Sequence, residues 1–336
     1  MITFAAMQTD EKRTFGSDLE FLSRHDEPVL LGEGEMRQVL VSPKYQGKVF
    51  TSTAEGLEGR SLGYLNYAAF GKATPDPHMN GYGGENRLWV GPEGGRFSVF
   101  IRQGDEQVYA NWHTPPAFDT EPWTRTSSRK DEVVMEKEME LENYLGTRFR
   151  LRAERSVRLL DEGALCLFLR LPALPEGLRW VAYSTANRLS NLNDFPWTPQ
   201  SGTLCLWMAD MLKTSSRSFS FAPYLAGSLA ERGAVATSDY FGPIPEGRYR
   251  EAGGLVFLRT DGRLRSKIGL SARRTRGLLG NYDPLAGHLT LAAFSMDAQT
   301  PYLNQEWDTA KDPMQGDVMH AYNDGPLDDG SQMGPF

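Results

Sequence analysis

The chain of 336 residues contains only two cysteines and five histidines. Cys166 and Cys205 lie in apolar, strand-like runs, ALCLFLRL and TLCLWMAD, so each is expected to be a small buried thiol and not half of a disulfide. The histidines are scattered and show no spacing that holds a structural zinc ion. The sequence therefore predicts neither a disulfide framework nor a transition-metal centre.

The chain also lacks an excess of positive charge and a long apolar run. Its formal net charge is −7, whereas binding to phosphate backbones requires clustered lysine and arginine. No window approaches the run of about 20 apolar residues that spans a bilayer, and Asp10 and Glu11 stand where a signal peptide would be apolar. Nucleic acid and membranes are not expected as partners. The sequence fits a cytosolic protein and equally an exported one whose leader has been removed.

Short segments in which apolar and charged residues alternate are abundant. Between Met139 and Leu159 the apolar residues occupy odd positions, while the even positions carry mostly glutamate and arginine. A period of two places the apolar side chains on one face of a pleated sheet. The segment therefore predicts antiparallel strands with one solvated face and a turn at Gly146.

Helical patterns are nearly absent from the rest of the chain. One short helix, DLEFLSRH, is predicted with Ser17 as its N-cap. Further strands are predicted at VLLGEG, MRQVLVSPKY, GKVFTSTA, ALCLFLRLPAL, LRWVAYSTANRLSNL, LCLWMADM, SFSFAPYL, GLVFLRTDG, SKIGLSA and HLTLAAFSM. This pattern excludes a doubly wound α/β fold. We predict an all-β protein, a large antiparallel β-sandwich that forms a single domain over residues 1–336.

The most distinctive segment is MNGYGGENRLWVGPEGGRFSVF, residues 79–100. Its glycines would let the backbone approach a ligand, and the guanidinium of Arg87 offers a planar fork of donors for vicinal hydroxyls or a carboxylate. A phosphate loop is disfavoured because its Lys-Ser/Thr pair is missing and no helix follows. The alternative is a hairpin turn over residues 91–95 with Arg87 in a surface ion pair.

This segment and the motifs around it resemble the galactose-mutarotase-like superfamily, and more specifically its uncharacterised bacterial members with a GGENRxWxGPEGG segment. The segment VLVSPKYQGKVFTSTAEG resembles the first meander of the superfamily. Asn86-Arg87-Leu88 resembles an Asn-Arg-Ile motif whose arginine contacts sugar hydroxyls. His113 in NWHTPP resembles a sugar-binding histidine, and Asp239 in TSDYFG resembles an aspartate that holds hydroxyls. The resemblance implies a β-supersandwich and a mono- or oligosaccharide ligand.

Two departures from the aldose 1-epimerases of this superfamily bear on activity. Their acid is a histidine in Asn-His-x-Tyr-Phe-Asn-Leu, but the matching ANRLSNL carries Asn187 there, and an amide is no general acid at neutral pH. Their base is a glutamate on a C-terminal strand, which is expected after the point where this chain ends, Phe336. The single domain is therefore expected either to lack its last strand or to lack the activity. His113, Glu306 and His320 are the substitute catalytic candidates.

The segment YLNQEWDTAKDPMQGDVMHAYNDGP, residues 302–326, combines aromatic rings with carboxylates. Aromatic faces stack on sugar C–H surfaces and carboxylates accept from hydroxyls, which suits a saccharide cleft. The oxygens could also hold Ca²⁺, although no EF-hand spacing is present, and a solvent-exposed acidic tail is the other interpretation. The predicted substrate-binding residues are Asn86, Arg87, Trp112, Asn187, Asp239, Trp307 and Asp324.

Three functions are compatible with these sequence motifs. The first is an aldose 1-epimerase-type isomerase that opens and closes a sugar ring at the anomeric carbon. The second is a non-catalytic sugar-binding or sensor module that keeps the cleft without the acid and base. The third is a glycoside hydrolase or lyase, because hydrolysis of a glycosidic bond uses two carboxyl groups at a fixed separation.

Two further expectations concern side-chain placement. Trp207 lies within a strand and is expected in the core, whereas Trp112 and Trp123 flank proline-rich loops and are expected at the cleft. Lys267 and the arginines that follow it are expected at a solvated sheet edge.

Overall fold

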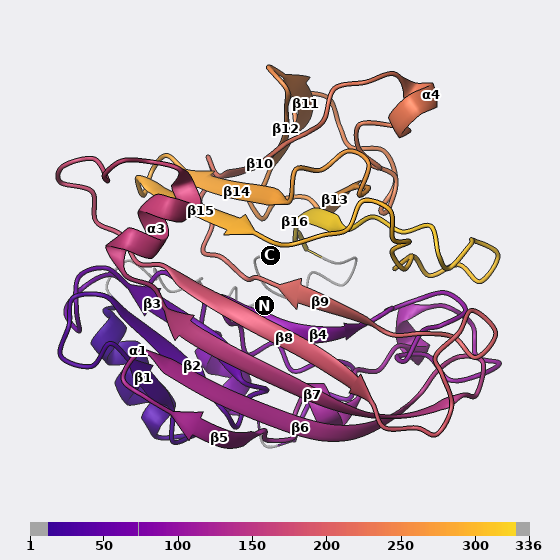
Figure 1. Ribbon diagram of the computed structural model, residues 1–336, viewed down its shortest axis with the longest axis horizontal. Coiled ribbons are helices and arrows are strands. Elements are labelled where there is room, and N and C mark those ends of the chain that lie inside the picture. The colour runs from indigo at the N-terminus through magenta and orange to yellow at the C-terminus, as the bar shows by residue number, and fades with distance from the viewer. Residues whose placement is uncertain (1–12, 73, 327–336) are drawn as a thin grey trace, which may run out of the picture.

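The computed structural model describes residues 13–72 and 74–326, and the regular structure of this part is mostly antiparallel β-strand (Figure 1). The helices in it are short. They are α1 (Phe15–Ser23), α2 (Tyr67–Phe70), α3 (Glu162–Leu169) and α4 (Leu229–Arg232), with 3₁₀ turns at Tyr109–Asn111 and Pro116–Phe118. The predicted all-β, antiparallel architecture is confirmed.

One four-stranded sheet, of order β5-β6-β7-β8, contains the segment with the clearest alternation. Its strands are β5 (Thr124–Ser128), β6 (Glu132–Glu142), β7 (Arg148–Leu159) and β8 (Tyr183–Asn191). Met139 pairs with Leu151 across β6 and β7, and both side chains are buried. Gly146 adopts a φ of 80° in the connecting turn, which favours glycine. The predicted strands, solvated face and turn are all confirmed.

Two smaller sheets pack against the apolar face of this sheet. They have the orders β1-β2-β3 and β4-β9. Their strands are β1 (Val29–Leu31), β2 (Gln38–Ser42), β3 (Lys48–Thr53), β4 (Arg87–Gly91) and β9 (Cys205–Ala209). Val41, Val49 and Leu88 from these strands share one hydrophobic core with Leu151 and Val157 of β7. The first half of the chain is therefore a layered β-sandwich, in the lower half of Figure 1.

The second half of the chain forms two more sheets, in the upper half of Figure 1. A five-stranded sheet has the order β11-β12-β10-β14-β15, and β13 pairs with β16. The strands are β10 (Phe219–Pro223), β11 (Tyr249–Ala252), β12 (Leu255–Arg259), β13 (Ser266–Leu270), β14 (Leu278–Asp283), β15 (His288–Ala293) and β16 (Met319–Asn323). Val256 and Leu258 of the larger sheet pack with Ile268 and Met319 of the pair in a second core.

Three local predictions are wrong. The run ALCLFLRL is helix α3 and not a strand, because an apolar run without a period fits either structure and Asp161 caps the helix by accepting from Ala164 N at 2.8 Å. The N-cap of α1 is Thr14 and not Ser17. Cys166 and Cys205 are free thiols as expected, but both are only half-buried.

Candidate functional site

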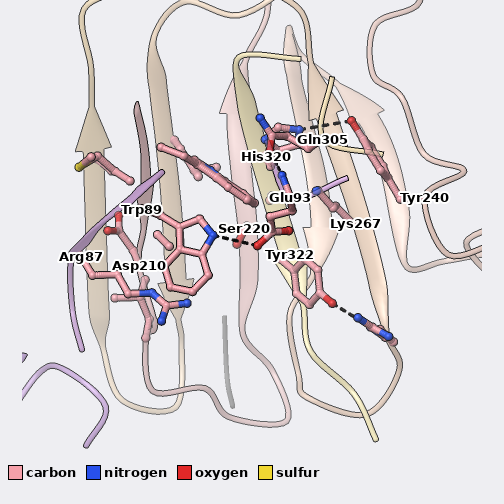
Figure 2. A pocket seen from close by; sticks show the side chains of 18 of the residues that line it. Arg87, Trp89, Glu93, Asp210, Ser220, Tyr240, Lys267, Gln305, His320 and Tyr322 are labelled. Carbon is pink, nitrogen blue, oxygen red and sulfur yellow. Dashed lines mark hydrogen bonds between the residues drawn. The ribbon is translucent and has the colours of Figure 1, made fainter. Parts of the chain in front are cut away.

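A cavity of about 470 Å³ lies between the two halves of the described chain. Its size falls in the range of small-molecule sites. One wall comes from β4 and β9 with the segment that follows each, and the opposite wall comes from β13 and β16. Figure 2 shows Arg87 and Asp210 on one side, Lys267 and Tyr240 on the other, and Glu93 between them. Ser220, Asn281 and Thr290, from the five-stranded sheet, complete the lining.

Strand alternation explains why the β13–β16 wall is polar. Lys267 pairs with Tyr322, and Gly269 pairs with His320, on the face toward the cavity. The intervening Ile268 of β13 points to the second hydrophobic core. Because successive side chains of a strand alternate between faces, the same two strands supply both core residues and a row of polar cavity residues.

Arg87, the first residue of β4, is only 3% exposed and lines the cavity. Its guanidinium lies over the Trp89 ring, 4.1 Å from the centroid, and its Nη2 is 3.9 Å from the sulfur of Met79. Among the described residues, its Nε and Nη1 have no hydrogen-bond partner. Burial lowers its pKa to about 10. The alternative of a surface ion pair is therefore wrong, and the cavity contains buried donors that need acceptors.

Two carboxyl groups share the cavity with Arg87. Asp210, directly after β9, accepts a hydrogen bond of 2.7 Å from the side-chain amide of Asn86, and burial raises its pKa to about 6. Glu93 accepts from Trp89 Nε1 at 3.0 Å (Figure 2). Burial raises the pKa of Glu93 as well, against the opposing charges of Lys267 and Arg87. Each group can exchange a proton closer to neutral pH than a solvated carboxyl can.

Asp317 and Tyr240 orient His320 on the opposite wall through hydrogen bonds. The Tyr240 hydroxyl donates to Asp317 Oδ2 at 2.8 Å and lies 3.3 Å from His320 Nε2. Because the hydroxyl has a single proton, this pattern assigns the ring proton to Nε2 and leaves a lone pair on Nδ1. Nδ1 has no partner within residues 13–72 and 74–326. Burial, and then the charge of Lys267, hold the pKa of His320 well below its usual range, so the imidazole is neutral.

Aromatic rings form a third part of the lining. Trp112 and Trp307 are stacked, with centroids 6.0 Å apart and an interplanar angle of 18°. Tyr109 stacks on the Trp112 ring at 6.1 Å. Trp207 also lines the cavity, although a core position was expected for it. Trp123, expected at the cleft, is buried in the first core.

Half of the site residues predicted from sequence line this cavity. Glu306 is one of them, and its carboxylate forms an ion pair with Lys311. The predicted residues that line the cavity are Arg87, Trp112, Glu306, Trp307 and His320.

Asn86 and Asn187 lie behind the cavity wall, where both accept hydrogen bonds from Arg155. Arg155 Nη1 donates to Asn187 Oδ1 at 2.8 Å, and Nη2 donates to Asn86 Oδ1. Asn86 reaches the cavity only through its hydrogen bond to Asp210. The structure therefore brings these two predicted residues together, as supports of the wall.

The remaining three predicted residues do not line the cavity. His113 is exposed, its Nδ1 lies 2.8 Å from the carbonyl oxygen of Pro77, and its ring stacks on His78. Asp239 is exposed beside Tyr240. Asp324 is buried after the end of β16. The structure therefore does not bring His113 and Asp239 into the cavity that Arg87 lines.

Several cavity residues were missed by the sequence reasoning. Lys267 was expected at a solvated edge, yet it is 6% exposed and lines the cavity. The segment SKIGLSA was correctly predicted as a strand, but the sequence did not show what its polar face would meet. Trp89 and Glu93 lie in the distinctive segment 79–100 but were not singled out as site residues. Asp210 and Tyr240 come from other parts of the chain, and their approach to that segment depends on contacts far apart in sequence.

The fold and site together define an antiparallel all-β protein with a polar, aromatic-lined cavity. The chain belongs to the family described as "Family of unknown function (DUF6786)", whose profile matches residues 13–336. No curated protein matches it. Among the described residues, no group of three or more His, Cys, Asp or Glu side chains is placed to hold a metal ion. No helix in that part of the chain has the length and apolar character needed to cross a membrane.

Two solved structures are similar to this chain. One is a putative aldose 1-epimerase (b2544) from Escherichia coli K12, with 10% identity, a TM-score of 0.44, and coverage of 79% of this chain and 76% of that one. The other is a galactose mutarotase-like protein from Lactobacillus casei ATCC 334, with 8% identity, a TM-score of 0.47, and coverage of 91% and 96%. Structural similarity at such low sequence identity does not show an activity for this chain.

Proposed function

We propose that this cavity binds a mono- or oligosaccharide and interconverts its anomers, as an aldose 1-epimerase does. The observation that carries the proposal is Arg87, a buried guanidinium with two unpartnered nitrogens that faces a cavity lined by tryptophan. Vicinal sugar hydroxyls present pairs of acceptor oxygens to such a fork. A sugar in the cavity would satisfy donors that are otherwise buried without partners.

The other groups of the cavity suit the two kinds of surface that a sugar has. The half-buried ring of Trp307, backed by the buried Trp112, is a large apolar face for C–H surfaces. The carboxyl groups of Asp210 and Glu93 accept from hydroxyls when ionised. A volume of about 470 Å³ is ample for a monosaccharide.

The proposed reaction needs one base and one acid on the same ring. The base removes the proton from the anomeric hydroxyl, the acid protonates the ring oxygen, and the bond between the anomeric carbon and that oxygen breaks to give an open-chain aldehyde. Rotation and reclosure return both protons and give the other anomer. We assign the base to His320, which is neutral, and the acid to Asp210, whose pKa is about 6.

This assignment changes two roles expected from the sequence. His113 lies outside the cavity lining and is not retained as the acid. The carboxylate of Glu306 is held by Lys311 at the cavity and is assigned to substrate contact.

A non-catalytic sugar-binding module is the second candidate. It is favoured by Asn187, which occupies the position of the epimerase acid and is bonded to Arg155 behind the wall. A binding module needs Arg87 and the tryptophans, but it needs neither His320 nor Asp210.

Calorimetry and NMR separate the two candidates. Sugar binding is measured by titration calorimetry on a panel of aldoses, and anomer exchange by NMR saturation transfer on the same panel. Arg87→Met should abolish both. The matched control Arg152→Met removes an exposed guanidinium paired with Glu138 and should change neither. Binding without accelerated exchange would select the non-catalytic module, and the absence of binding by any sugar would refute the proposal.

A further inference from the structure

We infer that the saccharide carries an anionic group, a carboxylate or a phosphate, and that Lys267 and Arg265 bind this group on the β13 wall. The inference rests on the proposed function, since it names the class of sugar that the same cavity takes. Both residues line the cavity, Lys267 from β13 and Arg265 from the position directly before that strand.

The ammonium group of Lys267 is buried without a direct ion pair in the described part of the chain. Lys267 is only 6% exposed, and the carboxyl groups of Glu93, Asp317 and Glu306 act on its charge, but none of them lies within 4.0 Å of its Nζ. Its nearest ring neighbours are Tyr240, with the Nζ 4.4 Å from the centroid, and Trp207, at 5.3 Å. A buried cation in this position is costly unless a ligand compensates it.

Arg265 uses only part of its hydrogen-bonding capacity within the described protein. Its Nε donates to the Tyr322 hydroxyl at 2.8 Å, and its guanidinium lies over Phe241, 4.2 Å from the ring centroid. These contacts fix the plane of the guanidinium and use one of its five N–H donors. In the described part of the chain its two terminal nitrogens form no ion pair with a carboxylate, so they can make a bidentate contact to an oxyanion.

Within the described residues, the carboxyl groups at the cavity form no ion pair with its three cations, Arg87, Arg265 and Lys267. Asp317 acts on the charge of Lys267 but accepts its hydrogen bond from Tyr240. Glu306 is already paired with Lys311. Asp210 is bonded to Asn86. Glu93 is bonded to Trp89 and forms no ion pair within 4.0 Å in the described residues. Because burial raises the pKa of both Asp210 and Glu93, their neutral forms are favoured more than in water.

Glu93 is one of the carboxyl groups that oppose an anion at this wall, since Glu93, Asp317 and Glu306 all act on the charge of Lys267. The charges of Lys267, then Arg87, then Arg265 act on Glu93 in turn. A bound carboxylate or phosphate would raise the pKa of Glu93 further, so binding of the anionic sugar should take up a proton. Neutral sugars have no such effect, and their hydroxyls do not balance a buried ammonium charge.

The test compares neutral sugars with their acidic counterparts. Titration calorimetry on the wild-type protein uses glucose and galactose, the corresponding hexuronates, and the hexose 6-phosphates. We expect one acidic series to bind at least about ten-fold more tightly than its neutral parent. The uronate and phosphate arms identify which oxyanion is recognised. Repeating the titration in buffers of different ionisation enthalpy should reveal proton uptake only with the acidic sugar.

The variant Lys267→Met keeps most of the side-chain volume and removes the charge. It should abolish the preference for the acidic sugar, so that the variant's affinities for the acidic and the neutral sugar agree within about two-fold. Lys130→Met is the matched control, since Lys130 is an exposed lysine paired with Glu35 and should leave the preference unchanged. If Lys267→Met does not fold, Arg265→Gln on the half-buried neighbour supplies the same measurement.

The outcomes separate this inference from the proposed function. Equal affinity of the wild-type protein for neutral and acidic sugars would overturn the inference and leave the sugar site intact. A preference that survives both Lys267→Met and Arg265→Gln would also overturn it. Failure of every sugar to bind would instead overturn the proposed function.

Discussion

Arg155 of β7 donates a hydrogen bond from Nη1 to Oδ1 of Asn187, its register partner on β8, at 2.8 Å. The same guanidinium donates from Nε to the carbonyl of Gly47 at 2.9 Å and from Nη2 to Asn86. Arg155 is fully buried. One side chain thus joins the four-stranded sheet to the chain segments before β3 and β4, and through Asn86 it supports Asp210 at the cavity.

Removal of this guanidinium should destabilise the fold. Arg155→Met leaves the acceptors on Asn187, Gly47 and Asn86 without their buried donor, so we expect the free energy of unfolding to fall by about 2–4 kcal/mol. Urea denaturation followed by circular dichroism measures the change. Arg152→Met, which removes an exposed arginine of the same strand, should cost less than about 1 kcal/mol. Equal losses in the two variants would contradict the anchoring role of Arg155.

Arg155 also illustrates what the sequence could predict about the fold. The alternation from Met139 to Leu159 predicted β6 and β7 because a period of two is a local property of the chain. Arg155 stands at an odd position, on the apolar side of that alternation, which indicated a buried charge but not its partners. The helix α3 was mistaken for a strand because its apolar run carries no period.

The site was predictable only where a motif or composition marked it. Arg87 was found through its glycine-rich segment and a family resemblance, and Trp307 through the mixture of rings and carboxylates around it. Lys267 lies on β13 and Asp210 directly follows β9, and their approach depends on how the two halves of the chain pack. No local pattern of the sequence encodes that approach.

The raised pKa of Asp210 predicts how stability depends on pH. Its pKa is about 6 in the folded protein against a usual 3.8, so the folded state binds the proton more tightly. The contribution of this group to stability therefore falls as the pH rises from about 4 to 6, and it stays low above that window. Asp210→Asn should be more stable than wild type at pH 8 by up to about 3 kcal/mol.

Comparison of Asp210→Asn with the wild-type protein at low pH provides the control. The amide still accepts from Asn86 through Oδ1, so the hydrogen bond seen in the wild type can persist. Near pH 3 the wild-type carboxyl is itself protonated, and the two proteins should have equal melting temperatures. A constant difference in melting temperature from pH 3 to pH 8 would show that Asp210 does not titrate as stated.

Substitution of Gly269 should be destabilising, because the side chains of Asp317 and Tyr240 leave no room for a Cβ at this position. A Cβ there would lie 2.2 Å from Asp317 Oδ2 and 2.7 Å from the Tyr240 hydroxyl oxygen. Gly269→Ala should therefore separate Asp317 from Tyr240 and lower the stability by about 1–3 kcal/mol. Tyr240 accepts a hydrogen bond from His320 Nε2 while it donates to Asp317, and this favours the Nε2–H tautomer. The variant should therefore also change the tautomer of His320 that ¹⁵N NMR detects.

Gly71→Ala is the matched control for this substitution. Its added Cβ would meet only the carbonyl oxygen of Ala68, at 3.8 Å, so its effect should stay within about 0.5 kcal/mol. If Gly269→Ala retained both the wild-type stability and the Nε2–H tautomer, the contact between Tyr240 and Asp317 would not be what orients His320.

The stacked pair of Trp112 and Trp307 predicts an optical signal for ligand binding. A sugar that lies on the Trp307 face should change tryptophan fluorescence, and Trp307→Ala should remove most of this change and weaken binding by about ten-fold. Trp180→Ala is the control, since Trp180 is half-buried, lies beside Arg37 and does not line the cavity. It should retain the wild-type affinity. Loss of affinity in Trp180→Ala but not in Trp307→Ala would place the sugar outside the cavity, because of these two residues Trp307 lines the cavity and Trp180 does not.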